Sequence, residues 1–244
     1  KDFGVKRVLI RGIKAAEDGR CVEPLRKADD SAVRGSFHVR DFSVKKLALK
    51  LSSDAVRVIG VKSGSVVTVS GTARVRRSES GEFVHDPGTD VAKIAVVERH
   101  RNTGNVGLGL IRGYGIKRGA VAVSVAHDSH NIIVTGKSDA DMAAAVERII
   151  AMEGGAVLIK DGEVLEEMPL PLGGIMSDQN GEWVDGKIRS LHKKAVDELG
   201  VSKDVEPLMT LCFMSLTVIP ELKLTDRGLF EAASFSFVPV EANG

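Results

Sequence analysis

Small and β-branched residues alternate between Gly119 and Ala126, and this alternation constrains the fold more than any other feature of the sequence. The valines fall on one face of the segment and small residues fall on the other, namely Val121, Val123 and Val125 against Ala120, Ala122, Ser124 and Ala126. A period of two predicts a β-strand. A face of small residues allows another element, or a ligand, to approach the backbone closely.

A polar segment follows this strand directly. Two imidazoles, a carboxylate, a hydroxyl and an amide are present in five residues, which are His127, Asp128, Ser129, His130 and Asn131. Polar groups without partners are expensive to bury, so this concentration at a strand end indicates a functional site. His127 and His130 would point to opposite faces of a continuing strand. They converge only if the chain turns at Asp128–Ser129, which these two residue types favour.

The downstream pattern predicts mixed secondary structure. A strand is expected over residues 132–135, and Ser138 is the predicted N-cap of a helix whose apolar stripe follows the helical period. Asp161–Gly162 predicts a hairpin over residues 156–165. A second helix is expected over residues 182–199, although Gly186 inside it costs roughly 1 kcal/mol relative to alanine. Residues 208–218 are predicted to form a core strand, and residues 235–240 a last strand.

The first part of the chain has a different pattern. Residues 5–11, 56–61 and 66–69 are rich in β-formers, whereas residues 24–36 are polar and suggest a linker. We therefore expect an α+β protein with a small β-rich domain at residues 1–88 and a mixed α/β layered domain at residues 89–244. Because the chain opens on Lys1 and enters a strand at once, we expect it to be a fragment.

Composition excludes some classes of protein. The net charge is +1, which argues against a broad electrostatic contact with nucleic acid. No apolar run approaches the roughly 18 residues that span a bilayer, so no membrane partner is expected. The two cysteines are far apart in sequence and define no disulfide framework, which predicts a cytoplasmic location.

The glycines between residues 104 and 115 resemble a dinucleotide fingerprint only superficially. The spacing from Gly107 is one residue too long, and no clean strand-then-helix context surrounds it. Turns and close backbone approach explain these glycines better.

Five motifs, in this order, resemble the C-terminal portion of bacterial adenine deaminase, a member of the amidohydrolase superfamily. They are residues 98–100, 109–115, 125–131, 170–177 and 218–229. The resemblance is specific from about Val91 to the end of the chain. It is weaker before that, where the chain is similar to the small β-domain that flanks the family's catalytic barrel.

The resemblance implies a metal-dependent hydrolase of purine salvage that converts adenine and water to hypoxanthine and ammonia. The family's divalent metal (manganese, iron or zinc) is held by a barrel whose first strand ends in a His-x-His pair. This sequence contains no such pair, so no metal ligand is assigned to it and the chain alone is expected to be inactive. The implied partners are adenine, the upstream barrel of the same protein and further copies in a homo-oligomer.

Three interpretations of the polar segment remain open. It reaches the active site of the complete enzyme, it forms a metal site of its own, or its groups hydrogen bond one another and brace the strand end. Under the first, His127 and Asp128 are the catalytic candidates, because deamination requires proton transfer. Ser129, His130 and Asn131 are then the substrate-binding candidates.

Glu98 and Arg99 are also candidates for substrate binding, because they end a strand that we expect to neighbour the one before His127. A plain ion pair at a strand end is the competing interpretation. For the protein as a whole, the rival function is a free-standing, non-catalytic module that binds purines or regulates another protein.

Overall fold

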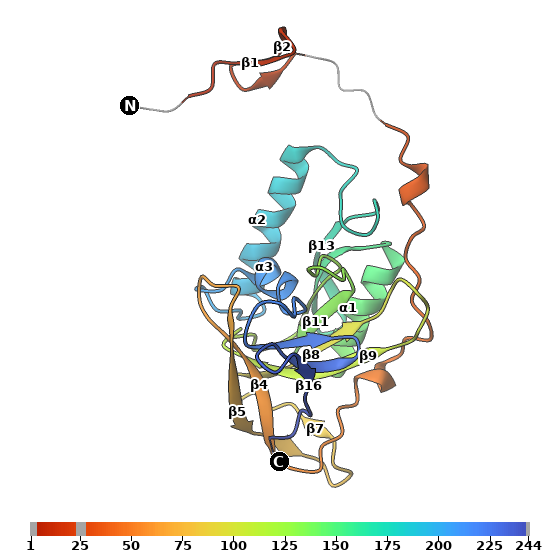
Figure 1. The fold of residues 1–244 in the computed structure, drawn as a ribbon, viewed down its shortest axis with the longest axis vertical. Coiled ribbons are helices and arrows are strands. Elements are labelled where there is room, and N and C mark those ends of the chain that lie inside the picture. The colour runs from red at the N-terminus through yellow and green to blue at the C-terminus, as the bar shows by residue number, and fades with distance from the viewer. Residues whose placement is uncertain (1–3, 23–27, 243–244) are drawn as a thin grey trace. The chain divides into compact units, whose positions relative to one another are not determined.

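The computed structural model describes residues 4–22 and 28–242, which divide into two compact units at Ala32/Val33 (Figure 1). The first unit contains a three-stranded antiparallel sheet. Its strands are β1 (Arg7–Ile10), β2 (Ile13–Glu17) and β3 (Arg20–Cys21). Its large apolar side chains are exposed, among them Leu9 and Ile13. The 3-10 helix η1 (Ser31–Val33) spans the boundary.

An eight-stranded sheet organises the second unit, in the order β13-β12-β10-β11-β8-β9-β4-β5. In chain order the strands are β4 (Ala55–Val61), β5 (Thr68–Arg74), β8 (Val91–Val97), β9 (Val106–Arg112), β10 (Ala120–Val123), β11 (Ile132–Gly136), β12 (Gly155–Lys160) and β13 (Glu163–Pro169). All neighbours pair antiparallel except β4 and β9, which run parallel.

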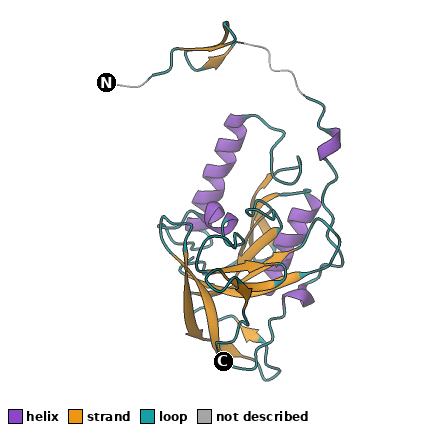
Figure 2. Ribbon diagram, viewed as in Figure 1, coloured by secondary structure: helices purple, strands orange, loops and turns teal. Residues whose placement is uncertain are grey.

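Three α-helices and several short elements complete the second unit (Figure 2). The helices are α1 (Asp139–Ala151), α2 (Gly181–Asp197) and α3 (Pro207–Cys212). The short elements are the 3-10 helix η2 (Val44–Leu47) and the strands β6 (Arg76–Arg77), β7 (Phe83–Val84), β14 (Leu222–Thr225), β15 (Gly228–Glu231) and β16 (Ser236–Phe237). None of the described helices is long and apolar enough to cross a membrane.

The two faces of the sheet belong to two different hydrophobic clusters. Val121 and Val123 of β10 pack in the cluster that contains Leu191 and Ala195 of α2. Ala120 and Ala122 belong instead to the cluster that contains the buried stripe of α1. The small face of β10 is therefore occupied by a helix, and its role is packing rather than ligand approach.

Most of the predicted elements downstream of Val91 are present. The Ser138 hydroxyl accepts from the Asp141 N–H as the N-cap of α1, and β12 and β13 form the predicted hairpin. Helix α2 matches its predicted range closely. The mixed, strand-rich composition agrees with the α+β class.

The core strand predicted over residues 208–218 is wrong. Residues 207–212 form helix α3, followed by turns. Pro207 occupies the first turn, where its missing N–H has no helical role, and the Glu206 carboxylate accepts from the N–H groups of Leu208 and Met209. These two start signals outweigh the apolar composition that suggested a strand.

The division of the chain differs from the boundary expected at residue 88. Strands β4 and β5 hydrogen bond into the same sheet as the downstream strands, through the parallel pairing of Ile59 with Ile111. The last strand, predicted over residues 235–240, is shorter and comprises only β16. The predicted linker at residues 24–36 lies partly outside the described residues, and Ser31–Val33 within it form η1.

Candidate functional site

The polar segment forms a turn between β10 and β11, as predicted. The backbone N–H of His127 donates to the carbonyl of Cys212 in α3 at 2.8 Å, and the N–H of His130 donates to the carbonyl of Ala126. His130 adopts a φ of 49°, which helps to reverse the chain. The turn is therefore fixed at both ends, once to α3 and once to Ala126, the residue directly before it.

The two imidazoles of this turn converge, which confirms the expected consequence of turning at Asp128–Ser129. The ring centroids of His127 and His130 lie 5.5 Å apart, and the His127 ring also packs on Phe213 at 4.8 Å. The Ala126 N–H donates to Nδ1 of His130 at 3.3 Å. A third imidazole is close, because Nε2 of His100 lies 2.7 Å from the Ser129 carbonyl oxygen.

The environment keeps the His130 imidazole neutral. Burial lowers its pKa, and the nearby His127 and Arg99 lower it further, whereas the Asp128 carboxylate acts in the opposite direction. Because its Nδ1 already accepts a backbone N–H, protonating this ring would also break a hydrogen bond. His130 thus offers a neutral Nε2–H to its surroundings near pH 7.

Glu98 organises the loop after β8. Its carboxylate accepts from the N–H groups of His100, Arg101 and Thr103 at 2.5 to 3.0 Å, and from the Thr103 hydroxyl. Burial opposes its ionisation, but these hydrogen bonds together lower its pKa. The carboxylate is saturated by its own loop, which places Glu98 in a bracing role.

Arg99 is only 2% exposed, and its guanidinium hydrogen bonds to the turn. Its Nε donates to the His130 carbonyl, its Nη2 donates to the Gly173 carbonyl at 3.0 Å, and its guanidinium lies 4.5 Å over the Phe37 ring. Burial lowers its pKa to about 10, with Glu98 opposing the shift. The guanidinium therefore joins three segments of the chain and is engaged by protein groups. Separate hydrogen-bond networks to protein groups take the place of the ion pair considered for Glu98 and Arg99, and the prediction that these two residues bind substrate stays a prediction.

Asn131 links the turn to the β14–β15 connection. Its Oδ1 accepts from the Arg99 backbone N–H at 3.3 Å, and its Nδ2 donates to Oδ1 of Asp226 at 3.5 Å. The Nδ2 of Asn105 donates to the other oxygen of Asp226 at 3.1 Å. Asn131 is buried, so its amide positions the turn from within. Asp226 is not among the residues predicted from the sequence, because no local pattern indicates that it lies beside Asn131.

A cleft of about 460 Å³ opens beside the turn. Asp128 and Ser129, both exposed, line one part of it, and Ser215 and Asp226 also line it. A second part is aromatic and is lined by Phe230, Phe235 and Phe237. The volume falls within the range of small-molecule sites, about 300–1,000 Å³.

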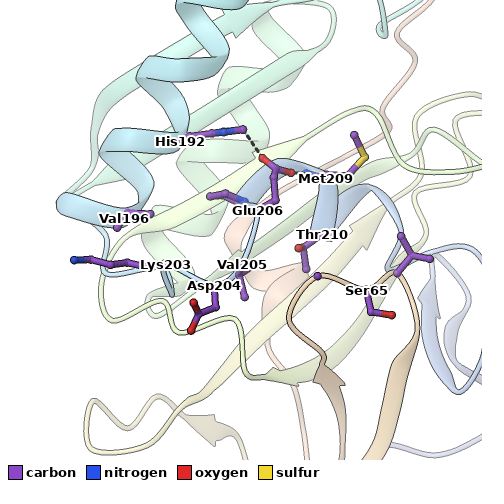
Figure 3. Close-up of a pocket in the computed structure, with 12 residues that line it drawn as sticks. Ser65, His192, Val196, Lys203, Asp204, Val205, Glu206, Met209 and Thr210 are labelled. Atoms are coloured by element: carbon purple, nitrogen blue, oxygen red, sulfur yellow. Dashed lines mark hydrogen bonds and ion pairs between the residues drawn. The ribbon is translucent and has the colours of Figure 1, made fainter. Parts of the chain in front are cut away.

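A second cavity, of about 540 Å³, lies where α2 and α3 approach the turn between β4 and β5 (Figure 3). His192 is paired with Glu206, whose carboxylate also caps α3, and Lys203 extends away from both. No residue of the 127–131 turn lines this cavity. The pair of His192 and Glu206 already stabilises the end of α3, so the smaller cleft beside the 127–131 turn is the better candidate site.

The described residues do not provide a metal centre. Within residues 4–22 and 28–242, no group of three or more His, Cys, Asp or Glu side chains is arranged to hold a metal ion. The geometry therefore gives no support to the interpretation of the turn as a metal site of its own. The residues that the structure describes thus offer no set of ligands for the divalent metal that the resemblance implies.

By its fold and its site, the chain is an α+β domain in which a polar turn borders a cleft of ligand size. A family model described as the adenine deaminase C-terminal domain matches residues 65–236. The chain belongs to the adenine deaminase family.

Three relatives with high sequence identity support this family membership. The chain is 55% identical over 238 residues to adenine deaminase 2 of Desulfotalea psychrophila, covering 98% of this chain and 41% of that protein. It is 44% identical over 241 residues to the adenine deaminase of Ligilactobacillus salivarius, covering 99% of this chain and 42% of that protein. It is 45% identical over 240 residues to adenine deaminase 2 of Carboxydothermus hydrogenoformans, covering 98% of this chain and 42% of that protein. The chain thus spans about two fifths of the length of these relatives.

Proposed function

We propose that this chain is the C-terminal part of a metal-dependent hydrolytic adenine deaminase, and that its turn and cleft complete the adenine site. The family membership and the names of the relatives support the reaction. The divalent metal belongs, in this proposal, to a barrel in the remainder of the same protein. The complete enzyme would act in cytoplasmic purine salvage as a homo-oligomer.

The observation that carries this proposal is the position of the turn. Asp128 and Ser129 line a cleft whose rim exposes large apolar side chains, with Val218 71% and Phe235 69% exposed. An exposed apolar patch bordered by polar groups is typical of a surface that another element covers. A barrel seated on this rim would enclose the cleft and bring the turn to the substrate.

Deamination of adenine requires proton transfer, which this proposal assigns to the turn. Water oxygen bonds to C6 of adenine, the bond from C6 to the exocyclic nitrogen breaks, and ammonia leaves after that nitrogen has gained a proton. The Asp128 carboxylate, beside the edge-packed imidazoles of His127 and His130, is suited to hold or pass that proton. The bracing by Glu98, Arg99 and Asn131 keeps these groups in place.

The experiment is an assay of ammonia release from adenine. We expect the longer protein, supplied with manganese, to release ammonia and hypoxanthine in equal amounts, and this chain alone to release none. Activity in neither sample, with the longer protein shown to be folded, would overturn the deaminase proposal. Turnover by this chain alone would overturn the assignment of the metal chemistry to the remainder of the protein.

A further inference from the structure

Asn180 and Gly181 form an exposed Asn–Gly pair at the start of helix α2. The other asparagines in the described part of the chain, Asn102, Asn105 and Asn131, are followed by threonine, valine and isoleucine. Those β-branched side chains crowd the backbone nitrogen that follows the asparagine, whereas glycine has no Cβ. A Cβ added to Gly181 would meet nothing within 4 Å, so the surroundings also leave this peptide bond open. Among the described asparagines, Asn180 is therefore the one whose side chain is most accessible to attack by its own backbone.

The local hydrogen bonds favour such an attack. Oδ1 of Asn180 accepts the Trp183 N–H at 2.9 Å, which folds the side chain over the first turn of α2. Gly181 is the first residue of that helix, so its N–H has no partner within the helix. The positive end of the helix dipole favours negative charge on the Gly181 nitrogen after it loses its proton. The Trp183 N–H in turn stabilises the oxyanion that develops at Oδ1 when the nitrogen attacks Cγ.

We propose that Asn180 is a site of intramolecular deamidation. The Gly181 nitrogen loses its proton to water and forms a bond to Cγ of Asn180. The bond from Cγ to Nδ2 breaks, and Nδ2 takes up a proton and leaves as ammonia. Water then opens the cyclic imide, giving aspartate if the bond to Cγ breaks and isoaspartate if the bond to the backbone carbonyl carbon breaks. The reaction concerns the chain's own amide and is independent of the proposed function.

The two products have different effects on α2. Aspartate keeps an oxygen in the place of Oδ1, so the cap survives, and its negative charge faces the positive end of the helix dipole. Isoaspartate lengthens the backbone by a methylene group and moves the Asn180 carbonyl, which accepts the Val184 N–H, out of the main chain. The hydrogen bonds from Trp183 and Val184 are then both disrupted. Trp183 is half-buried against the hydrophobic cluster that contains Leu191, so its surroundings change with the first turn.

Peptide mapping by mass spectrometry, after this chain has been aged at mildly alkaline pH, tests the proposal. We expect aspartate and isoaspartate at position 180 within the time that converts a synthetic peptide of residues 176–184, in the absence of adenine. The asparagines followed by β-branched residues should stay intact. Asn243–Gly244 lies outside the described residues and is counted separately from its own peptide. An unmodified Asn180 in the folded chain, when the synthetic peptide has converted, would overturn the proposal.

Gly181→Ala and Gly186→Ala separate crowding at the attacking nitrogen from a change in helix stability. Both place a methyl group on α2 where a Cβ meets nothing within 4 Å, so both variants should fold. Gly181→Ala should slow the conversion of Asn180 more than about tenfold, which corresponds to about 1.4 kcal/mol in the barrier. Gly186→Ala, the matched control, should leave that rate unchanged. Equal rates in the two variants would contradict the proposal, because the Gly181 nitrogen would not then be the attacking group.

Trp183, the only tryptophan of the chain, reports which product has formed. Asn180→Asp reproduces the aspartate product, so it should retain the Trp183 emission of the unaged chain and should not lower its Tm. The aged chain should show a red-shifted emission in proportion to its isoaspartate, because the first turn of α2 opens to water. Mapped isoaspartate without any change in emission would contradict the predicted disruption of the helix start.

Discussion

At the scale of single residues, buried cations and their partners explain how the site is held. Lys93, Arg99 and Lys223 are each 2% exposed or less, and backbone carbonyls accept from all three. Lys93 also pairs with Asp139. Lys223 donates to the carbonyls of Val66 and Phe213. The Phe213 ring packs on His127, so this ammonium helps to hold Phe213 against the turn.

The Lys223 ammonium makes the stability of the fold depend on pH. Burial lowers its pKa from 10.5 to about 8. Between these two values the unfolded chain holds a proton that the folded chain has lost, so the free energy of unfolding rises with pH across that window. Denaturant titrations from pH 7 to 10.5 should show this rise, at most about 3 kcal/mol from this group.

Lys223→Met should remove that part of the slope, whereas Lys62→Met, at an exposed lysine, should keep it. The same slope in Lys223→Met and in the wild type would show that the burial of this ammonium has no thermodynamic effect.

At the scale of elements, the sequence predicted the helices and strands that a local pattern marks, and it missed one that no visible period marks. Period-two alternation predicted β10, the Ser138 cap and its apolar stripe predicted α1, and Asp161–Gly162 predicted the β12–β13 hairpin. Helix α3 was missed because its six residues are too few for a helical period to be visible. Its capping residues, Glu206 and Pro207, were the only local indication.

Two glycines show opposite consequences of the same substitution. A Cβ on Gly107 in β9 would lie 1.8 Å from the Thr225 carbonyl oxygen, because the β14–β15 connection packs directly on that strand. Gly186 lies inside α2, where an added Cβ would meet nothing within 4 Å. We expect Gly107→Ala to destabilise the fold by about 1–3 kcal/mol or more. Gly186→Ala should stabilise it by about 1 kcal/mol.

Urea denaturation of both variants beside the wild type measures these changes. Equal effects of the same sign would contradict the account of how β9 meets the connection that carries Asp226.

At the scale of the whole molecule, the candidate site is assembled from segments that are distant in sequence. The turn with Asp128 was predictable because its residues are adjacent, but Ser215, Asp226 and Phe235 reach the same cleft only through long-range packing. The same reason explains why β4 and β5 were assigned to a separate domain. The pairing of β4 with β9 joins residues some 50 positions apart, which no local pattern reveals, and β5 enters the sheet by pairing with β4.

Glu98 and Arg99 also show that a local pattern does not reveal the partners of a residue. Glu98 and Arg99 stood out in the sequence because charged groups end a buried strand, but their partners decide their role. The Glu98 carboxylate is enclosed by its own loop, and the Arg99 guanidinium joins His130, Gly173 and Phe37. Charge at a strand end singled out these residues, and the structure shows which protein groups they hydrogen bond.

The central claim is that the turn acts on adenine in the complete enzyme, and kcat/KM for adenine in the longer protein tests it most directly. Asp128→Ala should lower kcat/KM more than about tenfold, or about 1.4 kcal/mol of transition-state stabilisation. Asp185→Ala, at an exposed carboxylate on α2 outside the cleft, should leave it unchanged. A loss smaller than tenfold in a folded Asp128→Ala enzyme would contradict the claim, because the turn would then brace the strand end and nothing more.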